Sequence, residues 1–153
     1  MEALRVVAIT QARVGSTRLP SKVLLSLGES TVLDTHLSRL KKSKKITRIV
    51  VATTHEADSE KICQIAANQE VECFKGDLDD VLDRFFQAAE KYNADIIVRL
   101  TSDCPLLDAD IVDQAVNLLL SGEYDYCSTG LIPEFPDGLD VEAFTKHALE
   151  RAW

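Results

Sequence analysis

The residues of this chain that are best suited to chemistry lie in a short basic loop near its amino terminus. Arg13, Arg18 and Lys22 place positive charge within ten residues, with a glycine, hydroxyl side chains and a proline between them. Guanidinium groups pair with phosphate oxygens, and Gly15 lets backbone amides approach a ligand closely. This composition is typical of a polyanion site, although a solvated basic turn would share it. The spacing matches neither a Walker A loop nor a G-x-G-x-x-G fingerprint.

The basic loop follows an apolar run, residues 4–9, that predicts a buried strand. A second polar segment, residues 101–103, follows another apolar run at 95–100. Because ligands bind beyond the carboxyl ends of parallel strands, we expect the two loops to meet at one edge of the sheet. Asp103 is then the candidate ligand of Mg²⁺, which carboxylates hold together with substrate phosphates. It could instead cap the turn or helix that follows.

Alternating strand and helix patterns predict the elements that position these loops. Strands are expected at residues 4–9, 48–54, 71–74, 95–100 and 141–144. Helices are expected from a cap at Ser30 or Thr31 to Lys42, at 57–68, 78–92 and 110–120, and from Thr145 onward. An irregular region rich in glycine and proline begins at Tyr124. The alternation predicts an α/β fold, a Rossmann-like and mostly parallel sheet with helices on both faces.

Composition narrows the function classes. The 153 residues, 46% of them hydrophobic, predict one domain with a real core, and the net charge of −8 argues against a nucleic-acid partner. The basic run at 41–45 is interpreted as a solvated helix terminus. No stretch resembles a signal peptide or a membrane span, so a cytoplasmic protein without a membrane partner is expected. The four cysteines lack C-x-x-C spacing and are expected to be buried, reduced thiols.

Four segments resemble cytidylyltransferases that make CMP-activated acidic sugars. They occur in the family's order, at residues 12–24 (ARVGSTRLPSKVL), 76–85, 99–106 and 136–144. The family includes the CMP-ketodeoxyoctonate and CMP-acylneuraminate synthetases, and the chain is most similar to the branch of spore coat polysaccharide biosynthesis protein F. The resemblance implies a fold of the nucleotide-diphospho-sugar transferase type. It also implies transfer of CMP from CTP to an acidic, sialic-acid-like 2-keto sugar, with release of pyrophosphate, in surface polysaccharide biosynthesis.

The resemblance assigns roles to individual residues. It implies that Arg13 and Lys22 are catalytic and contact the triphosphate with Arg18, and that Asp103 is catalytic as the ligand of Mg²⁺. Further nucleotide contacts are assigned to Ala12, Gly15, Ser16 and Arg84. Sugar contacts are assigned to Arg99, Asp140 and Glu142.

Alternatives accompany several of these residues. Asp140 and Glu142 alternate with apolar neighbours, which predicts that both carboxylates share one strand face, toward a sugar or toward solvent. Arg99 could face the active edge or pair with a neighbouring Asp. The acidic side chains of residues 77–83 are also interpreted as an exposed helix face. The three histidines, which lack metal-ligand spacing, are expected to be surface or structural residues: His36, His55 and His147.

The family resemblance covers a single nucleotidyltransferase-like domain at residues 1–153. Family members are usually longer, so the chain is expected to lack the later part of the fold, which brings a further acidic metal site and much of the dimer contact. A homodimer is a possible assembly. Two other functions stay open: a non-catalytic nucleotide-binding module, and a nucleotidyltransferase that uses another NTP and a sugar phosphate.

Overall fold

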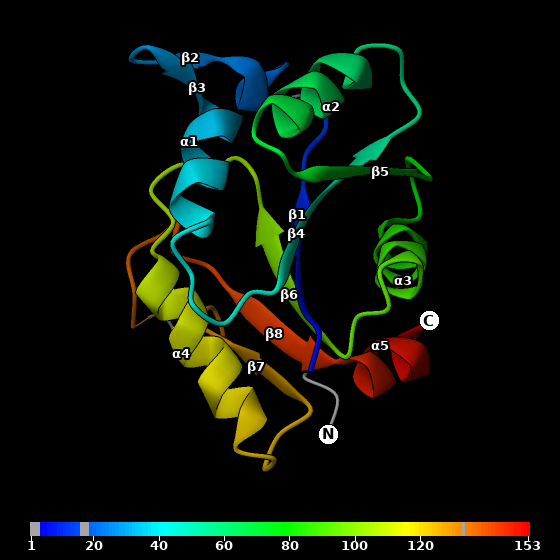
Figure 1. Cartoon of the computed structure of the whole chain (residues 1–153), viewed down its shortest axis with the longest axis vertical. Helices are drawn as coiled ribbons and strands as arrows, with labels where there is room; N and C mark the ends of the chain where they lie inside the picture. The colour runs from blue at the N-terminus through cyan, green and yellow to red at the C-terminus, as the bar shows by residue number, and fades with distance from the viewer. Residues whose placement is uncertain (1–3, 16–18, 133) are drawn as a thin grey trace.

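The computed structural model describes residues 4–15, 19–132 and 134–153 (Figure 1). A six-stranded sheet of order β5-β4-β1-β6-β8-β7 forms the centre of this part of the chain. Its strands are β1 (Val6–Gln11), β4 (Arg48–Thr54), β5 (Glu72–Gly76), β6 (Ile96–Thr101), β7 (Tyr126–Ser128) and β8 (Glu142–Thr145). Neighbours from β5 to β6 pair in parallel, whereas β8 and β7 join antiparallel. The prediction of a mostly parallel α/β sheet is confirmed.

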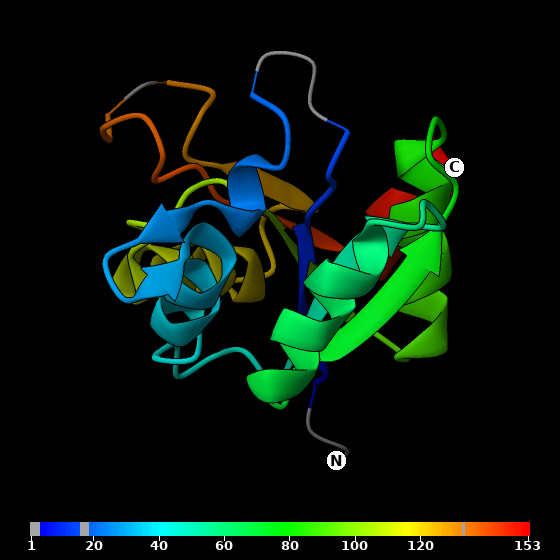
Figure 2. The same cartoon turned by 90° about the horizontal axis from the view of Figure 1, so that it is seen from above.

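Helices cover both faces of this sheet, as Figures 1 and 2 show. They are α1 (Val32–Leu40), α2 (Ser59–Asn68), α3 (Val81–Lys91), α4 (Ala109–Leu120) and α5 (Lys146–Ala152). Side chains alternate along β1, so Val6 and Ala8 pack in the core beneath α4, whereas Val7 and Ile9 pack toward α3 and α5. A third core cluster lies between α1, α2 and Val51 of β4. Helices α1, α2 and α4 therefore share one face, and α3 and α5 share the other.

Among the described residues, several helix starts are set by side-chain caps. A side-chain oxygen accepts a hydrogen bond from a backbone N–H of the first turn at Thr31, Asp80, Asp108 and Thr145. The third helix therefore begins at Val81, after its Asp80 cap, and not at Leu78 as predicted. The cap at Thr31 and the four main parallel strands lie close to their predicted positions.

The sequence did not predict several short elements of the described chain. A 3-10 helix, η1 (Lys22–Leu24), and a two-stranded hairpin of β2 (Ser26–Leu27) and β3 (Ser30–Thr31) connect β1 to α1. Strand β7 lies in the region predicted to be irregular. Elements of two or three residues are too short to show hydrophobic periodicity, so pairing with a neighbour decides them.

The prediction that all four cysteines are reduced thiols is wrong for one pair. Cys63 of α2 and Cys73 of β5 form a disulfide, with their Cα atoms 5.4 Å apart. Packing of α2 over β5 brings the two residues together, which a spacing of ten residues does not predict. Cys104 and Cys127 are free. No helix in the described residues is both long and apolar enough to cross a membrane.

Candidate active site

The basic loop and the Asp103 loop meet at the carboxyl edge of the parallel strands. Lys22 Nζ forms an ion pair with Asp103 Oδ2. Lys22, the last cation of the basic loop, begins η1, and Asp103 follows β6. Strands β1 and β6 are neighbours, with Gln11 opposite Thr101 at their carboxyl ends. The predicted convergence of a cationic and a carboxylate-bearing loop is therefore present.

Backbone contacts hold the basic loop at its base. The Ser21 N–H donates to the Val14 carbonyl at 3.0 Å, and the buried Ala12 donates from its N–H to the Ala52 carbonyl at 3.0 Å. Arg13 and Gly15 between them are exposed. Ser16 and Arg18 lie outside the described residues. The loop thus presents Arg13 to solvent, while Ala12 is buried and its N–H is already bonded to the Ala52 carbonyl.

Asp103 is half-buried in a cavity of about 520 Å³ that contains further carboxylates. Burial acts to raise the pKa of Asp103, but contacts with Lys22 and Thr101 outweigh it and hold that pKa below its ordinary value. The group is therefore ionised at neutral pH. The cavity is lined by Thr101, Asp103, Cys104, Pro105, Leu106, Asp137, Gly138 and Asp140. Asp137, which carried no predicted role, thus joins Asp103 and Asp140.

Arg84 is 1% exposed and lies beneath the turn that precedes α3. Its Nη1 donates to the Asp77 carbonyl, and its Nε has no hydrogen-bond partner among the described residues. Burial and then the positive charge of Arg13 lower the pKa of Arg84. A Cβ on Gly76 would lie 2.7 Å from Arg84 Cγ, so only glycine leaves room for the arginine there.

Asp77, Asp79 and Asp80 are exposed as predicted, but they precede α3, so the prediction that they form a helix face is wrong. Asp77 precedes α3, and its Oδ1 accepts from the N–H groups of Asp79 and Asp80 at 2.8 and 2.9 Å. Asp80 in turn caps the helix by accepting from the Asp83 N–H at 2.8 Å. These carboxylates shape the turn that the Arg84 guanidinium holds from below.

The predicted sugar-binding residues divide between two cavities. Arg99 and Glu142 lie opposite each other on β6 and β8 and form an ion pair. They line an apolar cavity of about 390 Å³ with Phe85, whose ring centroid is 5.8 Å from the Arg99 guanidinium. Asp140 lines the Asp103 cavity instead, because β8 begins only at Glu142. The prediction that Asp140 and Glu142 share one strand face is therefore wrong.

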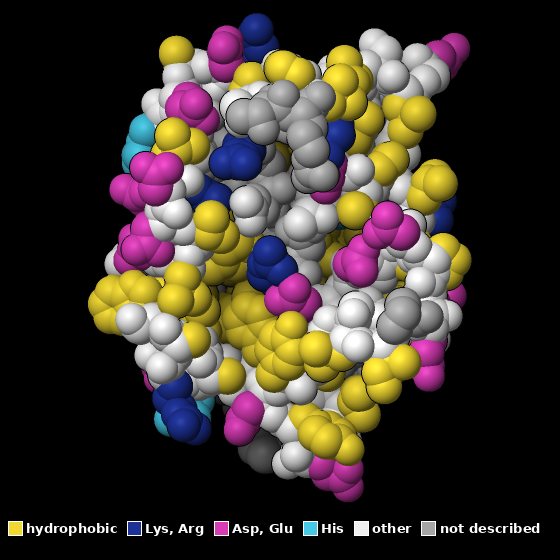
Figure 3. All heavy atoms as spheres, turned by 180° about the vertical axis from the view of Figure 1, so that it is seen from behind, with side chains coloured by type: hydrophobic (Ala, Val, Ile, Leu, Met, Phe, Trp, Pro, Cys, Tyr) yellow, Lys and Arg dark blue, Asp and Glu magenta, His cyan; other side chains and the backbone are white. Residues whose placement is uncertain are grey.

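Arg99 pairs with Glu142 and not with a neighbouring Asp, so that alternative is wrong, and the placement of Arg99 at the active edge stays a prediction. Figure 3, the view from behind, shows hydrophobic side chains gathered around charged ones on one face of the molecule. Arg99 and Glu142 are each about one-third exposed, so solvent screens their ion pair less than it would screen a fully exposed pair.

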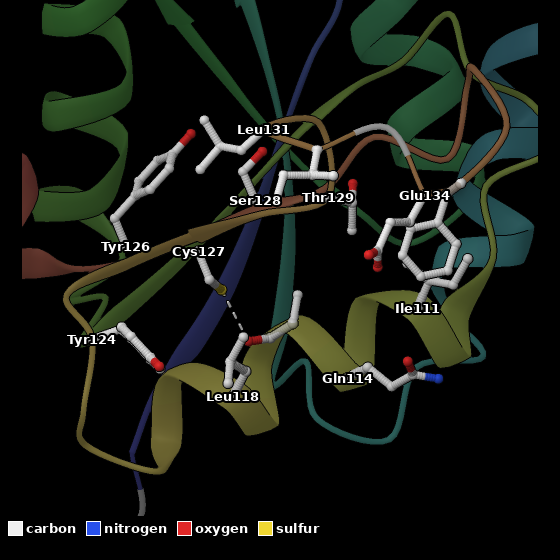
Figure 4. Close-up of a pocket in the computed structure, with 13 residues that line it drawn as sticks. Ile111, Gln114, Leu118, Tyr124, Tyr126, Cys127, Ser128, Thr129, Leu131 and Glu134 are labelled. Carbon is white, nitrogen blue, oxygen red and sulfur yellow. Dashed lines mark hydrogen bonds between the residues drawn. The ribbon is translucent and has the colours of Figure 1, made fainter.

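A larger cavity of about 580 Å³ lies between α4, β7 and the segment that follows β7 (Figure 4). Leu118, Tyr124 and Leu131 give it an apolar lining, and Cys127 in its floor donates to the Ala115 carbonyl at 3.2 Å. Glu134 is the one charged side chain among its described lining residues. Without a cation there, this cavity does not suit a phosphate.

The match to known protein families agrees with the chemistry at the sheet edge. Residues 7–153 match the family model described as "Cytidylyltransferase", which spans nearly the whole chain. The chain belongs to the cytidylyltransferase family. All the described residues of the Lys22–Asp103 site lie within the matched region.

Individual relatives of the chain extend this result. An uncharacterised protein of Methanocaldococcus jannaschii is 45% identical over 98% of this chain and 60% of its own length. Spore coat polysaccharide biosynthesis protein SpsF of Bacillus subtilis is 34% identical over 77% and 51%. The 3-deoxy-manno-octulosonate cytidylyltransferase of Chlorobaculum parvum is 34% identical over 88% and 54%.

A solved cytidylyltransferase structure from Leptospira borgpetersenii has the same fold. It is 42% identical, with a TM-score of 0.94, and the match covers 97% of this chain and 63% of that one. The chain therefore spans between about half and two thirds of the length of the relatives and the structure that it matches.

The donor groups of this site fit one mode of Mg²⁺ binding. No three His, Cys, Asp or Glu side chains within the described ranges stand close enough together to hold a metal ion by themselves. Mg²⁺ usually takes one or two carboxylates and completes its shell with water and substrate phosphates. Asp103, ionised at the edge of the sheet, fits that mode, with Asp137 and Asp140 in the same cavity.

His36, which the sequence predicts to be a surface or structural residue, is buried beneath this site. His36 of α1 is 0% exposed, and its ring contacts Thr10 of β1 and the Cys104 carbonyl. An apolar helix face that includes one histidine carries no sequence signal for these partners. Burial lowers the pKa of His36, although the Cys104 carbonyl and the negative charge of Asp103 oppose that shift.

We expect His36 to make the protein acid-sensitive. The pKa of His36 is lower in the folded protein than in the unfolded chain. The stabilising contribution of His36 is therefore present above its unfolded pKa of about 6.5. As pH falls below that value, the free energy of unfolding should decrease by at most about 1.4 kcal/mol per pH unit, until folded His36 also binds a proton. Urea unfolding of wild-type protein and of His36→Asn between pH 7.5 and pH 5 measures the difference.

The control for this prediction is His147→Asn, since His147 is exposed. That variant should follow the wild-type profile. An identical pH profile in His36→Asn and wild-type protein would contradict the prediction.

Proposed function

We propose that this chain carries the nucleotide site of an enzyme that transfers CMP from CTP to an acidic sugar, with release of pyrophosphate, in surface polysaccharide biosynthesis. The contact between Lys22 and Asp103 at the sheet edge carries the proposal. It unites a cationic loop with a carboxylate, the two kinds of group that a metal-bound triphosphate requires. Membership of the cytidylyltransferase family supports CTP as the nucleotide.

In this reaction an anomeric hydroxyl of the sugar attacks the α-phosphorus of CTP, and pyrophosphate leaves. Arg13 and Lys22 bind the phosphate oxygens and offset their charge, with Arg18 and Ser16 as further predicted contacts from the same loop. Asp103 would hold Mg²⁺, which would neutralise charge on the transferring phosphate. Positioning and charge neutralisation account for most of the acceleration in transfers of this kind, so few side chains need to take part in covalent chemistry.

Nucleotide binding displaces Lys22 from its partner in this proposal. In the structure Lys22 neutralises Asp103, so the carboxylate and the ammonium are held together before any ligand arrives. A triphosphate would give Lys22 a better partner, and Asp103 would then be free to hold Mg²⁺. The ion pair therefore holds both groups close to the positions that the proposal gives them.

Arg84 belongs to the nucleotide side of the site in this proposal. The Nε of its buried guanidinium has no hydrogen-bond partner in the described part of the chain, and the charge of Arg13 is near enough to lower the pKa of Arg84. Two cations near each other are mutually destabilising, and an anion between or beside them relieves that repulsion. The Asp77 turn that Arg84 holds then forms a wall of the nucleotide site.

The acidic sugar is assigned to the Arg99 cavity. A guanidinium pairs well with a carboxylate, and Phe85 and Phe144 offer apolar surface to a sugar ring. Glu142 can accept hydrogen bonds from sugar hydroxyls. Asp140, in the Asp103 cavity, is a second candidate for such contacts. A relative that is named 3-deoxy-manno-octulosonate cytidylyltransferase supports a 2-keto sugar acid as the acceptor.

The proposal predicts that pyrophosphate release requires CTP and a 2-keto sugar acid together. A matrix of the common NTPs against sugar acids and sugar 1-phosphates, with pyrophosphate as the readout, tests it. CTP binding without release in any combination would favour a non-catalytic nucleotide-binding module. Release with another NTP and a sugar phosphate would overturn both the nucleotide and the acceptor that are proposed.

A further inference from the structure

A chain of buried polar side chains runs beneath the Asp103 loop. Thr10, His36 and Ser102 are each 0% exposed. Thr10 Oγ1 lies 2.9 Å from His36 Nε2 and 2.8 Å from Ser102 Oγ. His36 Nδ1 lies 2.9 Å from the backbone oxygen of Cys104. These hydrogen-bonded side chains therefore link α1, through β1, to the two residues that flank Asp103.

The chemistry of these groups permits one arrangement of protons when His36 is neutral. The Cys104 carbonyl only accepts, so His36 Nδ1 carries the ring proton and donates it. Nε2 must then accept from the Thr10 hydroxyl. The Thr10 oxygen is left to accept from the Ser102 hydroxyl. Every member of the chain is satisfied in this arrangement, as buried polar groups require.

The hydrogen-bonded side chains fix the backbone on both sides of Asp103. On one side, Ser102 bonds to Thr10 through its hydroxyl and donates its N–H to the Gln11 carbonyl at 3.0 Å. On the other side, the Cys104 carbonyl is held by His36. The Asp103 carboxylate between these two anchors is half-buried and reaches Lys22.

We propose that neutral His36 is a positioning residue for Asp103, acting through the Cys104 carbonyl. It holds the turn at the angle that presents the carboxylate to Lys22 and to a nucleotide-bound metal. This inference rests on the proposed function. Groups that orient a metal ligand from behind commonly alter metal affinity by about 10–100-fold when they are replaced. A histidine that only fills the core would have no such selective effect.

Two amide replacements of similar size separate these possibilities. An asparagine at position 36 can place its side-chain N–H near the site of Nδ1 and keep the bond to the Cys104 carbonyl. A glutamine reaches the site of Nε2, toward Thr10, and leaves that carbonyl without its donor. The measurement is the affinity for CTP, by isothermal titration, with and without Mg²⁺.

His36→Gln should reduce the gain in CTP affinity that Mg²⁺ brings by about 10–100-fold and leave the affinity without Mg²⁺ unchanged. His36→Asn should keep the gain. Equal losses with and without Mg²⁺, or a full gain in His36→Gln, would overturn the proposal.

Asp103→Asn separates a failure of this inference from a failure of the proposed function. If Mg²⁺ still strengthens CTP binding fully in Asp103→Asn, the proposed metal ligand is wrong. If Asp103→Asn loses the gain but His36→Gln keeps it, the proposed function stands and the positioning role of His36 falls.

Two further measurements need no nucleotide. In wild-type protein, ¹⁵N NMR of the His36 ring should show a proton on Nδ1 and none on Nε2, and the opposite tautomer would refute the proposal. Hydrogen exchange of the Cys104 amide, which bonds to the Thr101 carbonyl at 3.2 Å, should accelerate in His36→Gln and not in His36→Asn. Equal exchange in both variants would refute it as well.

Discussion

Replacing Asp103 with asparagine is expected to abolish the gain that Mg²⁺ brings to CTP binding and to lower the rate of CMP transfer by about 10²–10³-fold. The substitution keeps the size and shape of the side chain but removes the negative charge that faces Lys22. Mg²⁺ then lacks its carboxylate, and charge on the transferring phosphate is neutralised less well. Without Mg²⁺, CTP binding should not weaken, because Lys22 is freed to meet the phosphates.

Isothermal titration with CTP and a pyrophosphate-release assay measure the two effects. Asp110→Asn is the matched control, since Asp110 is exposed in the first turn of α4 and the same charge is lost. That variant should behave like wild-type protein. Retention of Mg²⁺-dependent CTP binding in Asp103→Asn would exclude Asp103 as the metal ligand.

Arg13→Ala and Lys22→Ala should each weaken CTP binding by about 10–100-fold, and CMP binding by much less. Each removes a charge-assisted contact that contributes about 1.5–3 kcal/mol. The distal phosphates of CTP are absent from CMP, so a contact to them is lost only with the triphosphate. Lys22→Ala also leaves Asp103 without its ion-pair partner. CTP binding should therefore depend more strongly on Mg²⁺ in Lys22→Ala than in Arg13→Ala.

Arg48→Ala is the control for this pair of variants. Arg48 begins β4 at the opposite edge of the sheet and pairs with Glu72 at 3.0 Å. Its removal changes the net charge as Arg13→Ala does, without touching the site. A parallel fall in CTP and CMP affinity would mean that Arg13 and Lys22 contact the nucleoside or its first phosphate instead.

The antiparallel end of the sheet marks the limit of what local patterns predict. Residues 139–142 alternate between apolar and acidic side chains, which predicts a strand with both carboxylates on one face. Gly138 has a φ of +91°, and the Asp140 carboxylate accepts from the Gly138 N–H at 3.2 Å, so a turn occupies the first part of this stretch. Pairing with β6 then begins at Glu142, opposite Arg99. The turn sends Asp140 to one cavity and Glu142 to another.

The sequence alone determined the alternation of strands and helices, because continuous apolar runs and amphipathic periods are local properties. It also determined that the loop bearing Arg13 and Lys22 would meet Asp103. Parallel strands carry their carboxyl ends to one edge, whatever the details of packing. This meeting could be predicted without knowing a single side-chain contact.

Only the tertiary structure decided which partners the remaining polar groups have. The sequence around His36 does not predict its hydrogen bond with the Cys104 carbonyl, which lies 68 residues away along the chain. The burial of Arg84 depends on the turn above it, and the Cys63–Cys73 disulfide depends on how α2 lies over β5. Such contacts arise from the packing of elements distant in sequence, and packing is a property of the whole core rather than of any segment.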